Sequence, residues 1–243
     1  MLQISLAAEK IGSIFGLPIT NSLLATWLTM AVLIIFSWAA TRNLTMIPSG
    51  IQSLAEVLIG GLYDFFTSVT GEKHIKTFFS LVASLFLFII TANWLGLLPG
   101  FGTIGFFHGE EFVPLLRGAT ADLNMTVGLA ITSVLAIQYY GFKILGFHYR
   151  TRFLNFESPI MFYVGILELV SESSKVISFA FRLFGNIFAG EVLLAVMAFL
   201  MPFIIPLPFL MMELFVGFIQ ALVFSMLTAV FLNVAVSHGE AHA

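Results

Sequence analysis

The sequence contains no cysteine and very few charged residues. Of its 243 residues only 9% are Asp, Glu, Lys or Arg, whereas 59% are hydrophobic and the mean hydropathy is +1.04. Without cysteine the chain cannot have a disulfide framework, a thiolate metal site or a cysteine nucleophile. Soluble domains carry about 25% charged residues, so this chain has too little polar surface to be surrounded by water. The composition therefore predicts a polytopic membrane protein.

Patterns for catalysis and for nucleic-acid binding are missing as well. The net charge of −3 gives no electrostatic basis for binding nucleic acid. The metalloprotease motif H-E-x-x-H and the hydrolase motif G-x-S-x-G do not occur. His108 and His148 fall in expected loops, so no intramembrane histidine stands beside a carboxylate. We expect no catalytic centre in this chain itself, and neither a metal nor another cofactor.

Long uncharged runs identify the membrane spans. A helix needs about 20 apolar residues to cross a bilayer. Three separate runs meet this requirement, namely residues 21–41, 78–98 and 123–142. Two longer apolar segments follow, 158–201 and 203–237, and the prolines from position 202 onward should break the helix between them. We expect an all-α fold with about five membrane-embedded helices in a single domain, residues 1–243.

Residues 48–70 show a different pattern. Apolar residues recur at steps of three and four, as at Ile51, Leu54 and Leu58, and polar residues such as Glu56 occupy the other face. This pattern is typical of an amphipathic helix that lies in the membrane interface. A helix packed on protein would show the same pattern, so both interpretations stay open. The fold therefore includes one further helix, which we expect to be interfacial.

Charges in the short loops predict the orientation of the spans. Basic residues gather after the first and third spans: Arg42, Lys73, Lys76, Lys143, Arg150 and Arg152. The loop after the second span is mainly acidic, with Glu110, Glu111 and Asp122 against Arg117. Because basic loops stay in the cytoplasm, we expect the N-terminus outside and the C-terminus in the cytoplasm.

The segment 158–201 carries charges at membrane depth, where each costs several kcal/mol. Six polar residues are spaced by three or four and so share one stripe of a helix: Glu168, Glu172, Lys175, Ser178, Arg182 and Asn186. A polar seam between helices, with Lys175 neutralising a glutamate, is the structural alternative. Arg182 has no acidic residue three or four positions away, so its anion must come from another helix or another subunit.

The last two segments are expected to form a long, tilted hairpin. A helix over 158–201 would be about 60 Å long, against about 30 Å for the hydrocarbon core, so it must tilt steeply, break or leave the membrane. A turn near Pro202 would place Glu191 opposite Glu213, and Arg182 near the level of Gln220. Two neighbouring carboxylates cannot both ionise cheaply, so one is expected to hold a proton. This suits a proton relay, and a shared structural proton is the alternative.

Several motifs in the second half of the chain resemble one family. RLFGN at 182–186, followed by AGE at 189–191, resembles the signature of the a subunit of the F-type ATP synthase membrane sector. FIQALVFSMLTAVFL at 218–232 is similar to the last helix of that family. NWLGLLP at 93–99 and ADLNMT at 121–126 are similar to its middle helices. The resemblance runs from about residue 78 to the C-terminus, and the first 75 residues match in layout only.

The resemblance implies a function and a set of site residues. In that family the tilted hairpin packs against a ring of c subunits, each with one carboxylate in the membrane, and two offset half-channels lead protons to the ring. Arg182 would be the barrier between the half-channels and the partner of the ring carboxylate, because Arg is not deprotonated in proteins. The outer half-channel would contain Asn186, Glu191, Glu213 and Gln220. The cytoplasmic one would contain Glu168 and Ser178, with Lys175 nearby.

The resemblance also implies partners and a location. The partners would be the c-subunit ring, b-type peripheral stalk subunits and the rest of the ATP synthase, in a bacterial inner (plasma) membrane. The chain would couple proton flow to rotation and ATP synthesis as part of the stator. An ion-coupled secondary transporter is the alternative function. Such a protein should show paired half-repeats, whereas here the polar residues lie almost wholly in the last two segments.

Overall fold

The computed structural model describes residues 8–14, 17–98, 100–101, 104–108, 111–146, 149, 159–201 and 206–237. This part of the chain forms six α-helices, of which five are long and apolar enough to cross a membrane. The expected all-α fold with five such helices is therefore confirmed.

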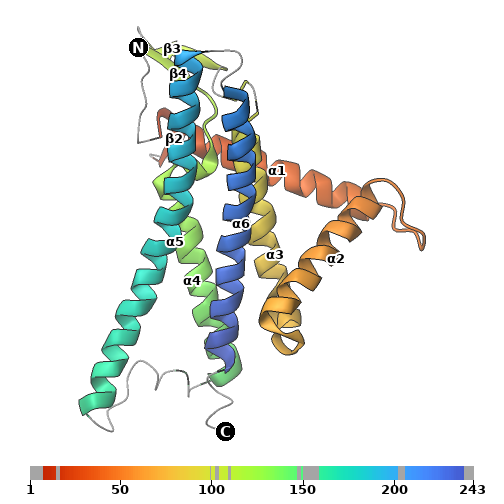
Figure 1. Ribbon diagram of the computed structural model, residues 1–243, viewed down its shortest axis with the longest axis vertical. Coiled ribbons are helices and arrows are strands. Elements are labelled where there is room, and N and C mark those ends of the chain that lie inside the picture. The colour runs from red at the N-terminus through yellow and green to blue at the C-terminus, as the bar shows by residue number, and fades with distance from the viewer. Residues whose placement is uncertain are drawn as a thin grey trace.

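The first two helices extend away from the other four, although both contact α3. They are α1 (Asn21–Thr41) and α2 (Ile51–Thr70). α1 makes a wide angle with the remaining long helices, and α2 runs back from the far end of α1 toward the lower end of α3 (Figure 1). α2 buries Leu62 and Phe66, but Ile51 and Leu54 are 52% and 58% exposed. Its apolar face is therefore covered by protein only in part.

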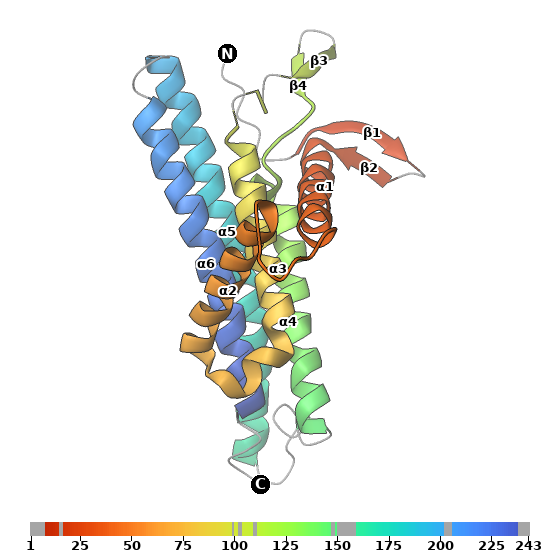
Figure 2. The same ribbon diagram turned by 90° about the vertical axis from the view of Figure 1, so that its right-hand side faces the viewer.

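The other four helices form the main body: α3 (Glu72–Gly96), α4 (Leu123–Leu145), α5 (Pro159–Leu200) and α6 (Pro206–Ser237). α6 packs most extensively against α3, and α5 against α4. Figure 2 shows these four helices running along one another in a second view. Large side chains such as Phe78, Ile89, Leu183 and Phe224 fill the core between them and are at most 2% exposed.

The lengths of the helices require different tilts in a membrane. α1 has 21 residues and would be about 32 Å long, close to the thickness of the hydrocarbon core. α5 has 42 residues and would be about twice as long. Because α1 stands at a wide angle to α5 and α6, it can cross upright while those two helices lie tilted (Figure 1). The long hairpin agrees with the prediction, and its tilt in a membrane stays a prediction.

Two helices, α3 and α6, begin at other residues than predicted. α3 begins at Glu72, six residues before the predicted span, because its first turns continue through charged residues. α6 begins at Pro206, so Pro206 and Pro208 lie in its first turn, where a missing N–H costs no hydrogen bond. The predicted turn near Pro202 lies outside the described residues.

Two small β-hairpins and a short 3₁₀ helix were not predicted. β1 (Lys10–Ile14) and β2 (Leu17–Thr20) pair antiparallel and lead directly into α1. β3 (Gly105–His108) and β4 (Glu111–Pro114) pair in the same way between α3 and α4. They are followed by the 3₁₀ helix η1 (Ala119–Ala121). β3 and β4 lie at the same end of the molecule as the end of α5 and the start of α6 (Figures 1 and 2), and we call this end the hairpin end.

Candidate functional site

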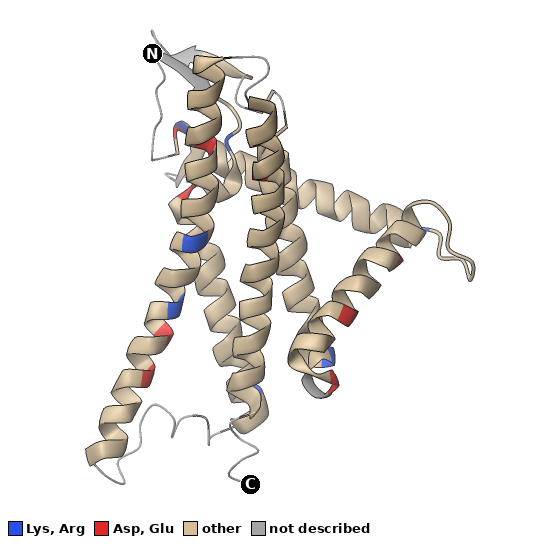
Figure 3. Cartoon of the chain, viewed as in Figure 1, with Lys and Arg blue, Asp and Glu red and all other residues tan. Residues whose placement is uncertain are grey.

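Charged residues of both signs follow one another along α5, whereas the neighbouring long helices are uncharged over most of their length (Figure 3). Arg182 lies in the middle part of α5. Its Nη2 donates a hydrogen bond to Ser178 Oγ, one turn earlier, at 3.2 Å. Its neighbour Leu183 is fully buried, whereas Phe181 is 56% exposed, so Arg182 lies at the border between the packed and the open face of α5.

Arg182 has no acidic partner in the described part of the chain. The ion pairs found there are Lys175–Glu172 and Arg117–Glu191. The sequence left open whether another helix or another subunit supplies the anion. None of the described helices supplies it.

One turn from Arg182 toward the hairpin end, a hydrogen bond joins the last two helices. Asn186 Nδ2 in α5 donates to Gln220 Oε1 in α6 at 2.6 Å. Gln220 is only 3% exposed, and its Nε2 finds no acceptor among the described residues. The predicted hairpin register is therefore close, since Gln220 lies level with Asn186, one turn beyond Arg182.

Farther along the hairpin, Glu191 and Glu213 meet at one small cavity. The cavity lies between α3, η1, α5 and α6, and its other polar lining residues are Asn93 and Thr120. Glu213 is 2% exposed and its carboxylate lies against Gly190, where any side chain would overlap it. The hairpin therefore brings the two glutamates together as its expected geometry requires.

A larger cavity of about 400 Å³ adjoins the small one at the hairpin end. Its polar lining residues are Glu9, Asn21, Arg117 and Glu191, and it shares Glu191 and part of its wall with the small cavity. Arg117 Nε lies 3.9 Å from Glu191 Oε2. In the sequence, Arg117 served only to predict the orientation of the spans, because nothing there pairs it with a residue as distant as Glu191. Glu191 thus lines both cavities, and Glu213 lines the smaller one.

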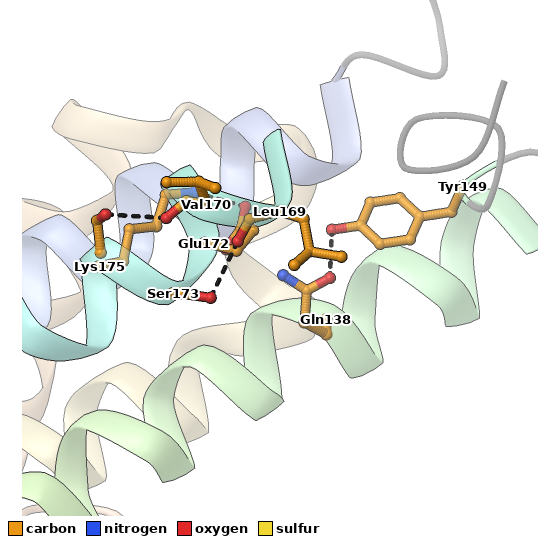
Figure 4. Close-up of polar contacts among 8 residues, drawn as sticks. Gln138, Tyr149, Leu169, Val170, Glu172, Ser173 and Lys175 are labelled. Atoms are coloured by element: carbon orange, nitrogen blue, oxygen red, sulfur yellow. Dashed lines mark hydrogen bonds and ion pairs between the residues drawn. The ribbon is translucent and has the colours of Figure 1, made fainter. Parts of the chain in front are cut away.

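The other polar group lies on the opposite side of Arg182. Lys175 Nζ pairs with Glu172 Oε1 at 2.6 Å and also lies 4.5 Å from the centre of the Phe231 ring. On the side of α4, the hydroxyl of Tyr149, which follows that helix, donates to Gln138 Oε1 in α4 at 2.9 Å (Figure 4). The Nε2 of Gln138 is buried and finds no acceptor among the described residues. Lys175 in α5 thus contacts α6 through Phe231, and Gln138 in α4 is bonded to Tyr149.

The predicted cytoplasmic residues are not gathered into one cluster. Ser178 accepts the hydrogen bond from Arg182, Lys175 is held by Glu172, and Glu168 lies half-buried one turn farther on. They share a stripe of α5, as predicted, but the buried member is Glu172, which is 8% exposed. No group of three or more His, Cys, Asp or Glu residues that could hold a metal occurs in the described ranges.

Comparisons with known proteins identify the family. The family model described as "ATP synthase A chain" matches residues 23–233. The ATP synthase subunit a of Citrifermentans bemidjiense is 37% identical over 223 residues, which cover 90% of this chain and 89% of the relative. That of Gloeobacter violaceus is 37% identical over 222 residues, covering 91% and 86%. That of Trichlorobacter lovleyi is 36% identical over 225 residues, covering 91% and 89%. The chain is therefore a multi-pass membrane protein that belongs to the family of the a subunit of the F-type ATP synthase membrane sector.

Proposed function

We propose that this chain is the stator subunit that offers two offset proton half-channels to a ring of c subunits and so couples proton flow to rotation and ATP synthesis. The observation that carries the proposal is the position of Arg182. It lies between two polar groups along α5, at the border of an open helix face, and without an acidic partner among the described residues. The chain has no catalytic centre of its own in this proposal, since ATP is made elsewhere in the complex.

The physical properties of Arg182 fit a barrier between two proton paths. An isolated charge in a membrane needs a partner, and a carboxylate on a passing rotor subunit would supply one at the open face. Arg stays protonated, so it attracts that carboxylate in its ionised form yet cannot hand a proton across itself. The ring would therefore have to turn in order to carry a proton from one path to the other.

The outer path is proposed to run from the hairpin end toward the ring. Protons would enter the larger cavity, pass Glu191 and Glu213, and reach the Asn186–Gln220 pair beside Arg182. Two carboxylates at one buried cavity can exchange a proton at low cost because both need not be charged together. The cytoplasmic path would pass Ser178 and Glu168, with Lys175 nearby. The Lys175–Glu172 ion pair lies on the other side of Arg182 from the outer path and supports this division into two paths.

The orientation and the other partners complete the proposal. Two basic residues at helix ends stack on aromatic rings, Arg42 over Trp38 and Lys143 over Tyr139. Aromatic rings mark both membrane interfaces, whereas an excess of Lys and Arg marks the cytoplasmic side, so the hairpin end would face outside. We place the N-terminus outside and the C-terminus in the cytoplasm of a bacterial inner membrane, with b-type peripheral stalk subunits holding the chain in the complex.

Substitutions of Glu213 test the proposal. We expect Glu213→Leu to slow passive proton flux through reconstituted membrane sectors stripped of the soluble head, because leucine carries no proton. Glu213→His should retain more flux, since imidazole can relay protons near neutral pH. Amounts of assembled complex are compared first, so that a folding defect is recognised. Native rates in Glu213→Leu would refute the outer path and make Glu213 a structural residue.

A further inference from the structure

A short buried segment, residues 117–122, enters between the helices next to the two glutamates. It contains η1, whose residues are at most 2% exposed, and it contacts α1, α3, α4 and α5. At its end, Asp122 Oδ2 accepts a hydrogen bond from the Ser22 hydroxyl at 2.6 Å. Near its start, Gly118 lies close to Gly96 of α3, since a Cβ at Gly96 would lie 3.2 Å from Gly118 Cα. We call residues 117–122 the plug.

The plug places Thr120 in the wall of the small cavity between Glu191 and Glu213. The centre of a water-sized sphere can move within a volume of about 10 Å³ in this cavity. One water molecule needs about 10–15 Å³ by this measure, and two to four polar partners. Glu213 Oε1 is buried and accepts no hydrogen bond from the residues that the structure describes. The cavity therefore has the size and the polar lining for a single water molecule.

Existing hydrogen bonds fix how Thr120 faces the cavity. Asn93 Nδ2 donates to the carbonyl oxygen of Gly217 at 3.0 Å, which orients the amide and its Oδ1. The Thr120 hydroxyl donates to that Oδ1 at 2.7 Å. A hydroxyl has one hydrogen and two acceptor lone pairs, so Thr120 can act toward the cavity only as an acceptor. A water molecule can donate to it, whereas an ionised carboxylate cannot.

We propose that Thr120 is a positioning residue of the outer proton path and holds one water molecule between Glu191 and Glu213. The proposal rests on the proposed function of the chain. With one hydrogen donated to Thr120, the water has its other hydrogen for an ionised carboxylate and its oxygen for a protonated one. It accepts the proton of one glutamate and gives its own to the other. One proton crosses the cavity, and the water is regenerated without a charge.

Substitutions at Thr120 separate this role from a packing role, because the two roles rank the variants differently. Thr120→Ser keeps the hydroxyl. Thr120→Ala removes it but leaves space for a second water, whereas Thr120→Val fills that space with a methyl group. We expect proton flux to fall in the order serine, alanine, valine, with valine reduced about tenfold, as for one hydrogen bond lost at the transfer step. A packing role predicts the reverse order for alanine and valine, since valine has the shape of threonine.

The variants are compared in reconstituted complexes stripped of the soluble head, at equal amounts of this chain, with Glu213→Leu as the reference. Native flux in Thr120→Val, or lower flux in Thr120→Ala than in Thr120→Val, overturns the water bridge. Native flux in Glu213→Leu instead overturns the outer path of the proposed function, whatever the Thr120 variants do. If Thr120→Val does not assemble, a structure of the native complex that resolves water decides. Water bonded to Thr120 and both glutamates supports the proposal, and a dry cavity refutes it.

Discussion

Gly190 and Glu213 form a contact between α5 and α6 that leaves no room for a side chain. A Cβ built on Gly190 overlaps the Glu213 carboxylate, and Glu213 is only 2% exposed, so the carboxylate has little space to move aside. Forcing an extra methyl group into a packed site costs about 1–3 kcal/mol. Gly190→Ala should therefore displace Glu213 from the small cavity. If that cost raises the barrier to proton transfer, flux drops by roughly 5-fold to 160-fold.

The assay is passive proton flux into vesicles that carry the membrane sector without its soluble head, driven by a potassium diffusion potential. Gly128→Ala in α4 is the matched control, because a Cβ there meets nothing within 4 Å. Both changes improve helix propensity by the same amount, so only the contact with Glu213 differs. In the double variant Gly190→Ala, Glu213→Asp, the acidic side chain is one methylene shorter, so part of the flux should return. Native flux in Gly190→Ala would refute the placement of Glu213 in the proton path.

Further predictions concern orientation and packing. Because the chain has no cysteine, Ile104→Cys should react with an impermeant thiol reagent from outside and Glu72→Cys only from the cytoplasm; the reverse pattern would refute the proposed orientation. Gln220→Leu should leave Asn186 without its acceptor and lower proton-driven ATP synthesis about tenfold at equal assembly, and an unchanged rate would show that the bond only joins the helices. Gly141→Ala should lower the amount of assembled chain, since a Cβ would lie 2.6 Å from the Tyr149 ring, and normal accumulation would contradict that packing.

The fold could be predicted from the sequence largely because a membrane leaves few choices. Uncharged runs near the length of a bilayer had to be helices, and α1 covers the predicted residues 21–41. The charged first turns of α3 lay outside the predicted span, because hydropathy marks where the membrane ends and not where the helix ends. The two β-hairpins depend on pairings between loop residues, for which composition gives no signal.

The candidate site was predictable only where its residues share one helix or one hairpin. The stripe of α5 follows from spacing, and the meeting of Glu191 with Glu213 follows from an antiparallel hairpin. The approach of Arg117 to Glu191 could not be foreseen, because it depends on how the plug enters between four helices. Thr120 was missed for the same reason. A threonine after a loop gives no sign in the sequence that it will be buried beside two carboxylates.

The central claim is that Arg182 keeps the two proton paths apart. The most direct measurement is proton flux into vesicles carrying assembled Arg182→Ala complexes, with ATP synthesis driven by an imposed gradient in parallel. We predict that synthesis is lost and that protons leak through the sector once the head is removed, because both the charge and the barrier are gone. Arg182→Lys should also lose synthesis, since an ammonium group can release its proton. Normal ATP synthesis in assembled Arg182→Ala complexes would show that Arg182 does not separate the two paths.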